Sequence, residues 1–245
     1  MTKKVSMITT TFNDTENLKK TIERVKKQDY ENIEYIIVDG GSGPETMALI
    51  REAELSFGDR LKWISEPDKG IYDAINKGIR MATGDIVGVM FDEMTSEHVV
   101  SQMVQAMESD QTDGVHGDIN YMDGDRIVRK WRMGQGNLRN GWMPGHPTLY
   151  LKKEIYDTYG LYKTDYKIAA DYEFMIRILK DNQVKLSYID QVLVNMFYGG
   201  TSTGGFSNYI LSLKEGHRAL KENGIQFACW TDFMRTMRVL LQFIR

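Results

Sequence analysis

The amino-acid sequence predicts an α/β fold, with a mostly parallel central sheet flanked by helices and a C-terminal helical extension. Three observations support this fold class. Apolar, β-branched runs alternate with amphipathic helical segments over residues 5–91, the last of these runs is entirely apolar, and helical spacing dominates residues 208–245. Strands that are buried on both faces have this appearance in parallel sheets covered by helices.

The first half of the chain repeats a strand–helix unit. Strands are expected at 5–12, 35–38, 61–65 and 86–91, and helices follow the first three of them, at 15–27, from residue 44, and at 71–81. Asn13, Asp14 and Thr15 offer N-caps for the first of these helices. The order β-α-β-α-β-α-β indicates a doubly wound sheet.

The second half of the chain is less regular. A helix is expected at 99–108, a hairpin at 115–122 and 126–131, a short strand at 148–151, a helix at 171–180, an extended segment at 186–196, and helix from 208 onward. The hairpin is predicted because Asp123-Gly124-Asp125 separates two β-type runs.

Composition narrows the function classes. The 245 residues carry a net charge of −3, which argues against generic nucleic-acid binding, since phosphate backbones require an excess of Lys and Arg. The single cysteine, Cys229, excludes an internal disulfide and a cysteine-rich zinc site. No apolar stretch is long enough to span a bilayer, and the N-terminus lacks the features of a signal peptide. We therefore expect a cytoplasmic protein.

Acidic residues follow three of the four strands expected in the first half, and hydroxyl residues follow the first strand. Asp39, Asp68 and the pair Asp92-Glu93 would meet at the carboxyl edge of the sheet, where open α/β sheets bind ligands. Such a cluster suits Mg²⁺ or Mn²⁺, or the hydroxyls of a ribose. The alternative is that each acid only marks a turn. The glycine motifs of dinucleotide, P-loop and α/β-hydrolase sites are absent.

Several motifs together resemble one known family. They are the run VSMITTTFN at 5–13, VDGGS at 38–42, SEPDKGIYDAINKG at 65–78, ATGD at 82–85, PGHPT at 144–148 and YKIAADYEFMIR at 166–177. The chain is similar to the family 2 glycosyltransferases of GT-A fold, and to members that make bacterial surface polysaccharides such as colanic acid or O-antigen. The resemblance implies an inverting transfer of a hexosyl or N-acetylhexosaminyl group from a nucleotide sugar to a lipid-linked saccharide.

The resemblance also implies an organisation and a donor site. Residues 1–205 would form the GT-A domain, with a donor half at 1–95 and an acceptor half at 96–205, and residues 206–245 would be the extension. The donor would be bound by Thr9, Thr11, Asp39, Asp68 and Asp73.

The implied metal site, for Mg²⁺ or Mn²⁺, consists of Asp92 and Glu93. Here the chain departs from the family, which usually carries two adjacent aspartates where this sequence reads Phe91-Asp92-Glu93-Met94. The departure leaves open whether the metal site is intact and which of the two acids binds.

Asp171 matches the position of the family's catalytic base, which removes a proton from the acceptor hydroxyl. The alternative role is a helix N-cap. Glu173 lies two residues further along the expected helix and would point elsewhere. His146 is expected either to contact the acceptor or the diphosphate, or to be an ordinary loop histidine.

Two features remain open. Trp131, Trp142 and Tyr150 would suit a sugar-stacking platform or core packing, and for Trp131 packing is preferred. The segment 231–245 reads as a basic amphipathic helix that either contacts the inner face of the plasma membrane or docks on the core or on a partner subunit.

Two other function classes compete with a transferase. The chain would be a non-catalytic sugar-nucleotide binder or scaffold of a polysaccharide assembly complex if the altered acidic motif abolishes catalysis. A nucleotidyltransferase would require a glycine-rich basic loop after the first strand, and residues 9–13 do not supply one.

Overall fold

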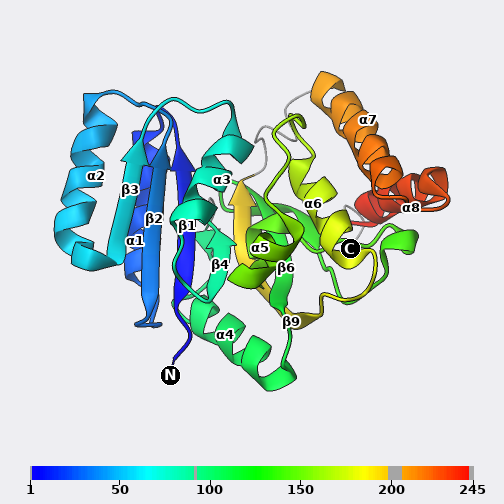
Figure 1. Ribbon diagram of the computed structural model, residues 1–245, viewed down its shortest axis with the longest axis horizontal. Helices are drawn as coiled ribbons and strands as arrows, with labels where there is room; N and C mark the ends of the chain where they lie inside the picture. The colour runs from blue at the N-terminus through cyan, green and yellow to red at the C-terminus, as the bar shows by residue number, and fades with distance from the viewer. Residues whose placement is uncertain (1, 91–92, 198–205, 243–245) are drawn as a thin grey trace.

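A computed structural model describes residues 2–90, 93–197 and 206–242. Within these residues nine strands form one sheet in the order β3-β2-β1-β4-β8-β6-β9-β5, and β7 pairs with β6 (Figure 1). The expected α/β architecture is confirmed. The sheet is parallel across its first four strands and mixed beyond them.

The parallel part of the sheet aligns the carboxyl ends of its strands. It consists of β3 (Leu61–Ser65), β2 (Ile33–Asp39), β1 (Val5–Thr11) and β4 (Ile86–Val89). Thr11 is paired with Asp39, and Asp39 with Ser65, so these three strands end at the same level. Polar residues far apart in the sequence therefore meet at one edge.

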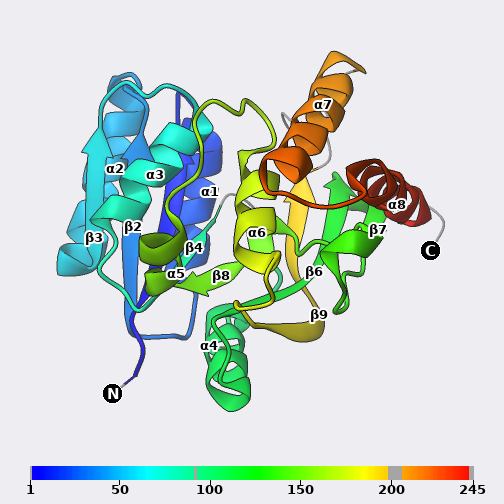
Figure 2. The same cartoon turned by 45° about the vertical axis from the view of Figure 1, so that its right-hand side comes forward.

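Helices cover both faces of this sheet (Figures 1 and 2). Buried side chains of α1 (Thr15–Lys26), α2 (Pro44–Phe57) and α4 (Val99–Asp110) pack with one core cluster. Those of α3 (Ile71–Met81), α5 (Lys153–Tyr159) and α6 (Ala170–Leu179) pack with the other. The helices α1 and α2 thus cover one face and α3 the other, because the chain crosses from β3 back past β1 to β4, as in a doubly wound sheet.

The later strands are β5 (Glu93–Met94), β6 (Gly114–Asp123), β7 (Arg126–Trp131), β8 (Tyr150–Lys152) and β9 (Leu186–Phe197). The hairpin is confirmed, because β6 and β7 pair antiparallel around the expected turn. β8 begins later than expected, since residues 146–148 form a 3₁₀ turn. The sequence analysis missed both α5 and the short β5.

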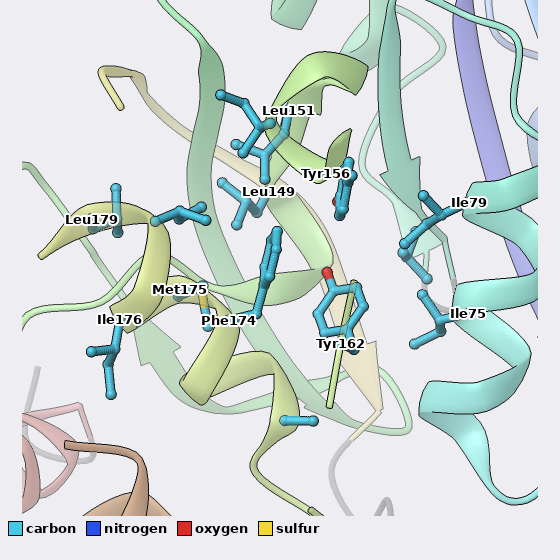
Figure 3. Packing of buried hydrophobic residues seen from close by; sticks show 14 of the residues in the cluster. Ile75, Ile79, Leu149, Leu151, Tyr156, Tyr162, Phe174, Met175, Ile176 and Leu179 are labelled. Carbon is cyan, nitrogen blue, oxygen red and sulfur yellow. The ribbon is translucent and has the colours of Figure 1, made fainter. Parts of the chain in front are cut away.

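An aromatic core fixes α6 against the sheet (Figure 3). The rings of Phe174 and Tyr156 stack with centroids 5.1 Å apart, and Tyr162 lies 4.7 Å from Phe174. Ile75 and Ile79 of α3 pack into the same cluster. The start of α6 is therefore held next to the start of α3.

The opposite, amino-terminal edge of the sheet contains a buried acid. Glu34 accepts hydrogen bonds from Ser6 (2.6 Å) and Thr83 (2.6 and 2.8 Å), and Lys62 Nζ lies 2.7 Å from it. Burial alone would raise the pKa of Glu34, but these partners outweigh it and hold the pKa well below its usual range. Thr83, part of one family motif, therefore has a structural role here.

The helical C-terminal segment forms two helices, α7 (Phe206–Glu222) and α8 (Ala228–Leu241). The break between them contains Gly224 at φ +72° and Phe227 at φ +59°. No helix in the described part of the chain is both long and apolar enough to cross a membrane.

Candidate active site

Asp39 is a fully buried acid at the carboxyl end of β2. Its Oδ2 accepts hydrogen bonds from the backbone of Gly41 (3.2 Å) and Ser42 (2.9 Å) and from the Ser65 hydroxyl (2.6 Å), and its Oδ1 accepts one from the Ser42 hydroxyl. The carboxylate thus ties the turn after β2 to the end of β3. This arrangement shapes the edge of the sheet from within.

Two of the three threonines of β1, the predicted donor-binding residues Thr9 and Thr11, have buried hydroxyls. The Thr9 hydroxyl donates to the carbonyl of Met90 (3.0 Å) and accepts from Tyr35 (3.1 Å). The Thr11 hydroxyl is buried and has no hydrogen-bond partner among the described residues. Of the two, only Thr11 has hydrogen-bonding capacity left for a ligand or an ordered water.

Asp68 and Asp73 lie at the entrance to α3. The Oδ1 of Asp68 accepts a hydrogen bond from the backbone N–H of Gly70 (2.8 Å). Its Oδ2 lies against Gly40, so that a Cβ added at Gly40 would be 2.7 Å from this oxygen. Asp73 accepts from Lys69 N (3.0 Å) and so closes the first turn of the helix. Asp68 therefore borders the turn that Asp39 holds, and Asp73 lies further on, in the first turn of α3.

Phe12 is a residue that the sequence analysis overlooked. It follows β1 and is 63% exposed, and its ring is 3.1 Å from where a Gly40 Cβ would be. An exposed ring at the ligand-binding edge of a sheet is suited to stacking on a flat base. The signal was available, since an aromatic residue directly follows the first strand.

The acids expected to bind metal do not assemble in the described part of the chain. Glu93 is in β5, and its carboxylate lies 3.9 Å from Arg24 of α1, on the sheet face opposite α6. Asp92 lies outside the described residues. No three His, Cys, Asp or Glu side chains among those described converge as metal ligands. We therefore assign no chemical step to a metal.

A cavity of ≈ 950 Å³ opens between α3, α6, α8 and the β6–β7 hairpin. From the first half of the chain, residues 1–95, it is lined by Asp14, Ile71, Tyr72 and Ile75. Two predicted residues, Asp171 and His146, line it from the other half. Thr9, Thr11, Asp39, Asp68 and Asp73 do not line it. The first turn of α3 connects the two regions, because it carries both Asp73 and Tyr72.

Asp171 stands in the first turn of α6, which begins at Ala170. Its Oδ1 accepts hydrogen bonds from Tyr172 N (2.8 Å) and the Tyr72 hydroxyl (3.1 Å). Its Oδ2 accepts none from any residue the structure describes. One carboxylate oxygen is thus oriented by the protein while the other remains available.

Asp171 is not the N-cap of α6, although its carboxylate accepts the first-turn N–H of Tyr172. The N-cap is Ala169, which has no side-chain cap. Glu215 of α7 instead accepts hydrogen bonds from the backbone N–H groups of Lys167 (2.9 Å), Ile168 (2.9 Å) and Ala169 (3.0 Å). A distant acid therefore holds the loop that leads into α6, and periodicity gives no signal for such a contact.

Tyr72 is a second residue that the sequence analysis overlooked. Its hydroxyl also contacts the Ile168 carbonyl (2.5 Å), so it links α3 to the loop before α6. Burial, followed by the neighbouring Asp171 carboxylate, raises the pKa of Tyr72 far above its usual range. The hydroxyl therefore stays protonated, and its single hydrogen is shared between the Ile168 carbonyl and the Asp171 carboxylate.

His146 is half-buried at the cavity, and one ring nitrogen lies 2.9 Å from the Tyr162 hydroxyl. Burial lowers the pKa of His146, and the Asp171 carboxylate opposes this shift. It is therefore not an ordinary surface histidine.

Glu173, as expected, faces away from the cavity. It is fully buried, with Arg177 and Lys163 both 2.9 Å away. These partners hold the pKa of Glu173 below its usual range against the opposing effect of burial. This acid is structural.

The aromatic platform forms only in part. Trp131 and Trp142 line the cavity, whereas Tyr150 is buried in the core away from it. The Trp142 indole N–H donates to the carbonyls of Met133 and Gly134, both at 3.1 Å, which fixes its ring.

α8 docks beside the platform and helps to line the same cavity. The Arg235 guanidinium lies 4.4 Å from the ring of Tyr172, and Arg238 donates to the Asn140 carbonyl (2.8 Å). A Cβ at Gly141 would come within 2.2 Å of the Arg235 backbone nitrogen. One face of the helix is therefore packed closely on the protein.

Comparison with solved structures supports the fold. TarS of S. aureus (residues 1–349) superposes with a TM-score of 0.71 at 14% identity, covering 96% of this chain and 71% of that one. The mannosyltransferase PcManGT from Pyrobaculum calidifontis gives a TM-score of 0.66 at 16% identity, covering 98% and 75%.

Comparison with known sequences shows the family. A glycosyltransferase of Mycobacterium tuberculosis (strain H37Rv) of uncharacterized role is 33% identical over 186 residues, covering 71% of this chain and 68% of the relative. The PGL/p-HBAD biosynthesis glycosyltransferase of strain H37Ra is 26% identical over 219 residues, covering 84% and 80%. These relatives are mycobacterial glycosyltransferases, so they do not support the expected specific similarity to colanic acid or O-antigen enzymes. The model of glycosyl transferase family 2 matches residues 6–176, and the chain belongs to that family.

Proposed function

We propose that this protein is an inverting glycosyltransferase that moves a sugar from a nucleotide-sugar donor to a saccharide acceptor. The observation that carries the proposal is Asp171, which lines a large cavity with one oxygen held by Tyr72 and the other available. A base needs this arrangement, because it must be oriented and yet reach a substrate proton.

Asp171 would take the proton of the acceptor hydroxyl as that oxygen attacks the anomeric carbon. The bond between this carbon and the nucleoside diphosphate breaks, and the diphosphate leaves with the bonding electron pair. Attack from the side opposite the leaving group inverts the anomeric centre. Tyr72 is a positioning residue that keeps the carboxylate in reach.

The donor would bind at the carboxyl edge of β1 to β3. Asp39 and Thr9 would act by holding the turn in shape, since their polar atoms are already bonded within the protein. Asp68, Asp73, Thr11 and the exposed Phe12 would border the nucleoside. The solved structures named above include TarS in complex with UDP-GlcNAc and PcManGT with GDP-Man and Mn²⁺. They support a pyrophosphate-linked donor and a trial of Mg²⁺ or Mn²⁺, for which Asp92 is the candidate ligand.

The acceptor would be a lipid-linked saccharide of bacterial surface polysaccharide synthesis, used at the inner face of the plasma membrane. Support comes from the outward face of α8, where Trp230 (54%), Phe233 (55%) and Leu240 (51%) are exposed. Exposed apolar side chains on an amphipathic helix favour the membrane interface. The rest of the proposed contact segment, residues 243–245, lies outside the described residues.

The test measures nucleoside diphosphate release from UDP-, GDP- and dTDP-sugars, with and without Mn²⁺. One donor should turn over, and Asp171→Asn should reduce turnover by about 10²–10⁴-fold while donor affinity is kept. Asp157→Asn, an exposed acid on α5, serves as the matched control. Near-normal turnover of Asp171→Asn would refute the assignment. Tight donor binding with no turnover by the wild type would favour the non-catalytic binder.

A further inference from the structure

The cavity that contains Asp171 is basic although the chain as a whole is acidic. Six Lys and Arg residues line it against two carboxylates, Asp14 and Asp171, counted over the described residues. The net charge of the whole chain is −3. The cations that line the cavity are Arg129, Lys130, Arg132, Lys167, Arg235 and Arg238.

Part of this positive charge is not neutralised within the protein. Arg132 lies 3.5 Å from the buried Asp118, and Arg235 lies 3.5 Å from Asp232. Lys130, Lys167 and Arg238, by contrast, form no ion pair with any residue between 2 and 242 that the structure describes. A ligand with negative charge would complete the cavity.

The positions of these cations favour the acceptor over the donor. They come from β7, the loop before α6, and α8, whereas the donor half contributes Asp14, Ile71, Tyr72 and Ile75 and no cation. If these cations bound the donor pyrophosphate, we would expect some of them to come from the donor half, at the carboxyl edge of its strands.

α8 lies outside the segment shared by the family, which matches residues 6–176. It is fastened to β7 at its end, where Gln242 accepts from Lys130 N (3.2 Å) and from the Arg129 side chain (2.7 Å). Arg235 and Arg238 are therefore placed in the cavity by an element beyond the residues that the family model matches. This makes α8 an element that can set acceptor specificity.

We propose that the acceptor carries a phosphate ester, which binds among Lys130, Lys167 and Arg238. This inference rests on the proposed function, since it names the substrate class of the same cavity. Phosphate oxygens accept charge-assisted hydrogen bonds from Lys and Arg. Trp131 and Trp142 supply the neighbouring aromatic surface, against which a sugar ring fits. The phosphate belongs either to a lipid carrier or to a polymer of sugar or polyol phosphates.

The test uses isothermal titration calorimetry on the full chain without donor. The probes are octyl phosphate, glycerol 1-phosphate, uncharged octyl glucoside and glucuronate, with UDP titrated separately to report on the donor site. We expect both phosphates to bind, and the combined variant Lys130→Gln, Lys167→Gln, Arg238→Gln to weaken them by about tenfold or more. The matched control replaces three exposed cations in α1, at its C-cap and in α2, through Lys19→Gln, Lys27→Gln and Arg51→Gln, and should bind like the wild type.

The outcomes separate this inference from the proposed function. Much tighter binding of octyl phosphate than of glycerol 1-phosphate supports a lipid carrier, and equal binding supports a phosphate polymer. If octyl glucoside binds as tightly as octyl phosphate, or if glucuronate binds more tightly than the phosphates, the proposal that the acceptor carries a phosphate is wrong. If the triple variant weakens UDP binding as much as it weakens phosphate binding, the three cations bind the donor, and the proposed acceptor phosphate is again wrong. The effect of Asp171→Asn on turnover tests the proposed function and does not depend on the result of this binding experiment.

Discussion

The carboxyl edge of the parallel strands and the cavity under α8 use their polar groups in opposite ways. At the edge, Asp39 and Thr9 are buried, and their oxygens bond to neighbouring backbone and hydroxyl groups. In the cavity, Asp171 keeps an available oxygen, and Lys130 and Arg238 lack an acidic partner among the described residues.

This difference separates two roles for an acid that a sequence pattern cannot distinguish. A carboxylate that accepts several internal hydrogen bonds fixes the shape of a binding edge and contributes to stability. A carboxylate held at one oxygen is left able to react. Asp39 is of the first kind and Asp171 of the second, and substitutions can test the contrast.

The largest expected effect is on stability at the edge. Asp39→Ala would leave the hydroxyls of Ser42 and Ser65 without their acceptor and lower the free energy of unfolding by about 3 kcal/mol. Asp171→Ala should lower it by less than about 1 kcal/mol. Urea denaturation of both variants measures this. Equal losses would remove the distinction between the two acids.

A second prediction concerns the opposite edge of the sheet, where Glu34 is also locked inside the protein. Glu34→Gln should cost about 2–3 kcal/mol at pH 7, because two lysines lose their charged partner. The folded pKa lies below the ordinary 4.5, so this stabilisation is present above pH 4.5 and is lost as the pH falls further. Denaturation at pH 7 and pH 3 should therefore show a smaller difference between variant and wild type at pH 3. A difference independent of pH would contradict the assignment.

A third prediction tests how tightly the edge is shaped. Gly40→Ala would place a Cβ 2.7 Å from an Asp68 oxygen and 3.1 Å from the Phe12 ring, which should weaken donor binding by about tenfold. Gly43→Ala is the control, because nothing lies within 4 Å of its Cβ and its φ is −70°. Nucleotide titration measures both. Similar affinities of the two variants would place the donor elsewhere.

The smallest expected effect lies in the cavity. Tyr72→Phe removes a hydroxyl that orients Asp171 at 3.1 Å, and we expect kcat to fall by about fivefold to tenfold with the donor KM unchanged. Steady-state kinetics with varied donor separates the two constants. A rise in KM alone would mean that Tyr72 serves binding.

Much of the fold was predictable because strand and helix periods are local. The strand 61–65 and the helix 71–81 have the expected bounds, since a short run of β-type residues and an amphipathic helix face leave direct patterns in the chain. The short β5 was missed because two residues carry no period. Among the site residues, Asp171 and His146 were placed in one cavity, while Glu93 turned toward α1.

The sequence by itself determined the alternating architecture, the family and the candidate base, because each rests on residues close together in the chain or on motifs in a fixed order. Only the tertiary structure decided which polar groups are hydrogen-bonded within the protein and which are available to a ligand. Glu215 holds the residue before α6 from 46 positions away, and α8 brings Arg235 beside Tyr172. Such contacts depend on how separate elements pack, and packing between distant segments leaves no local period to read.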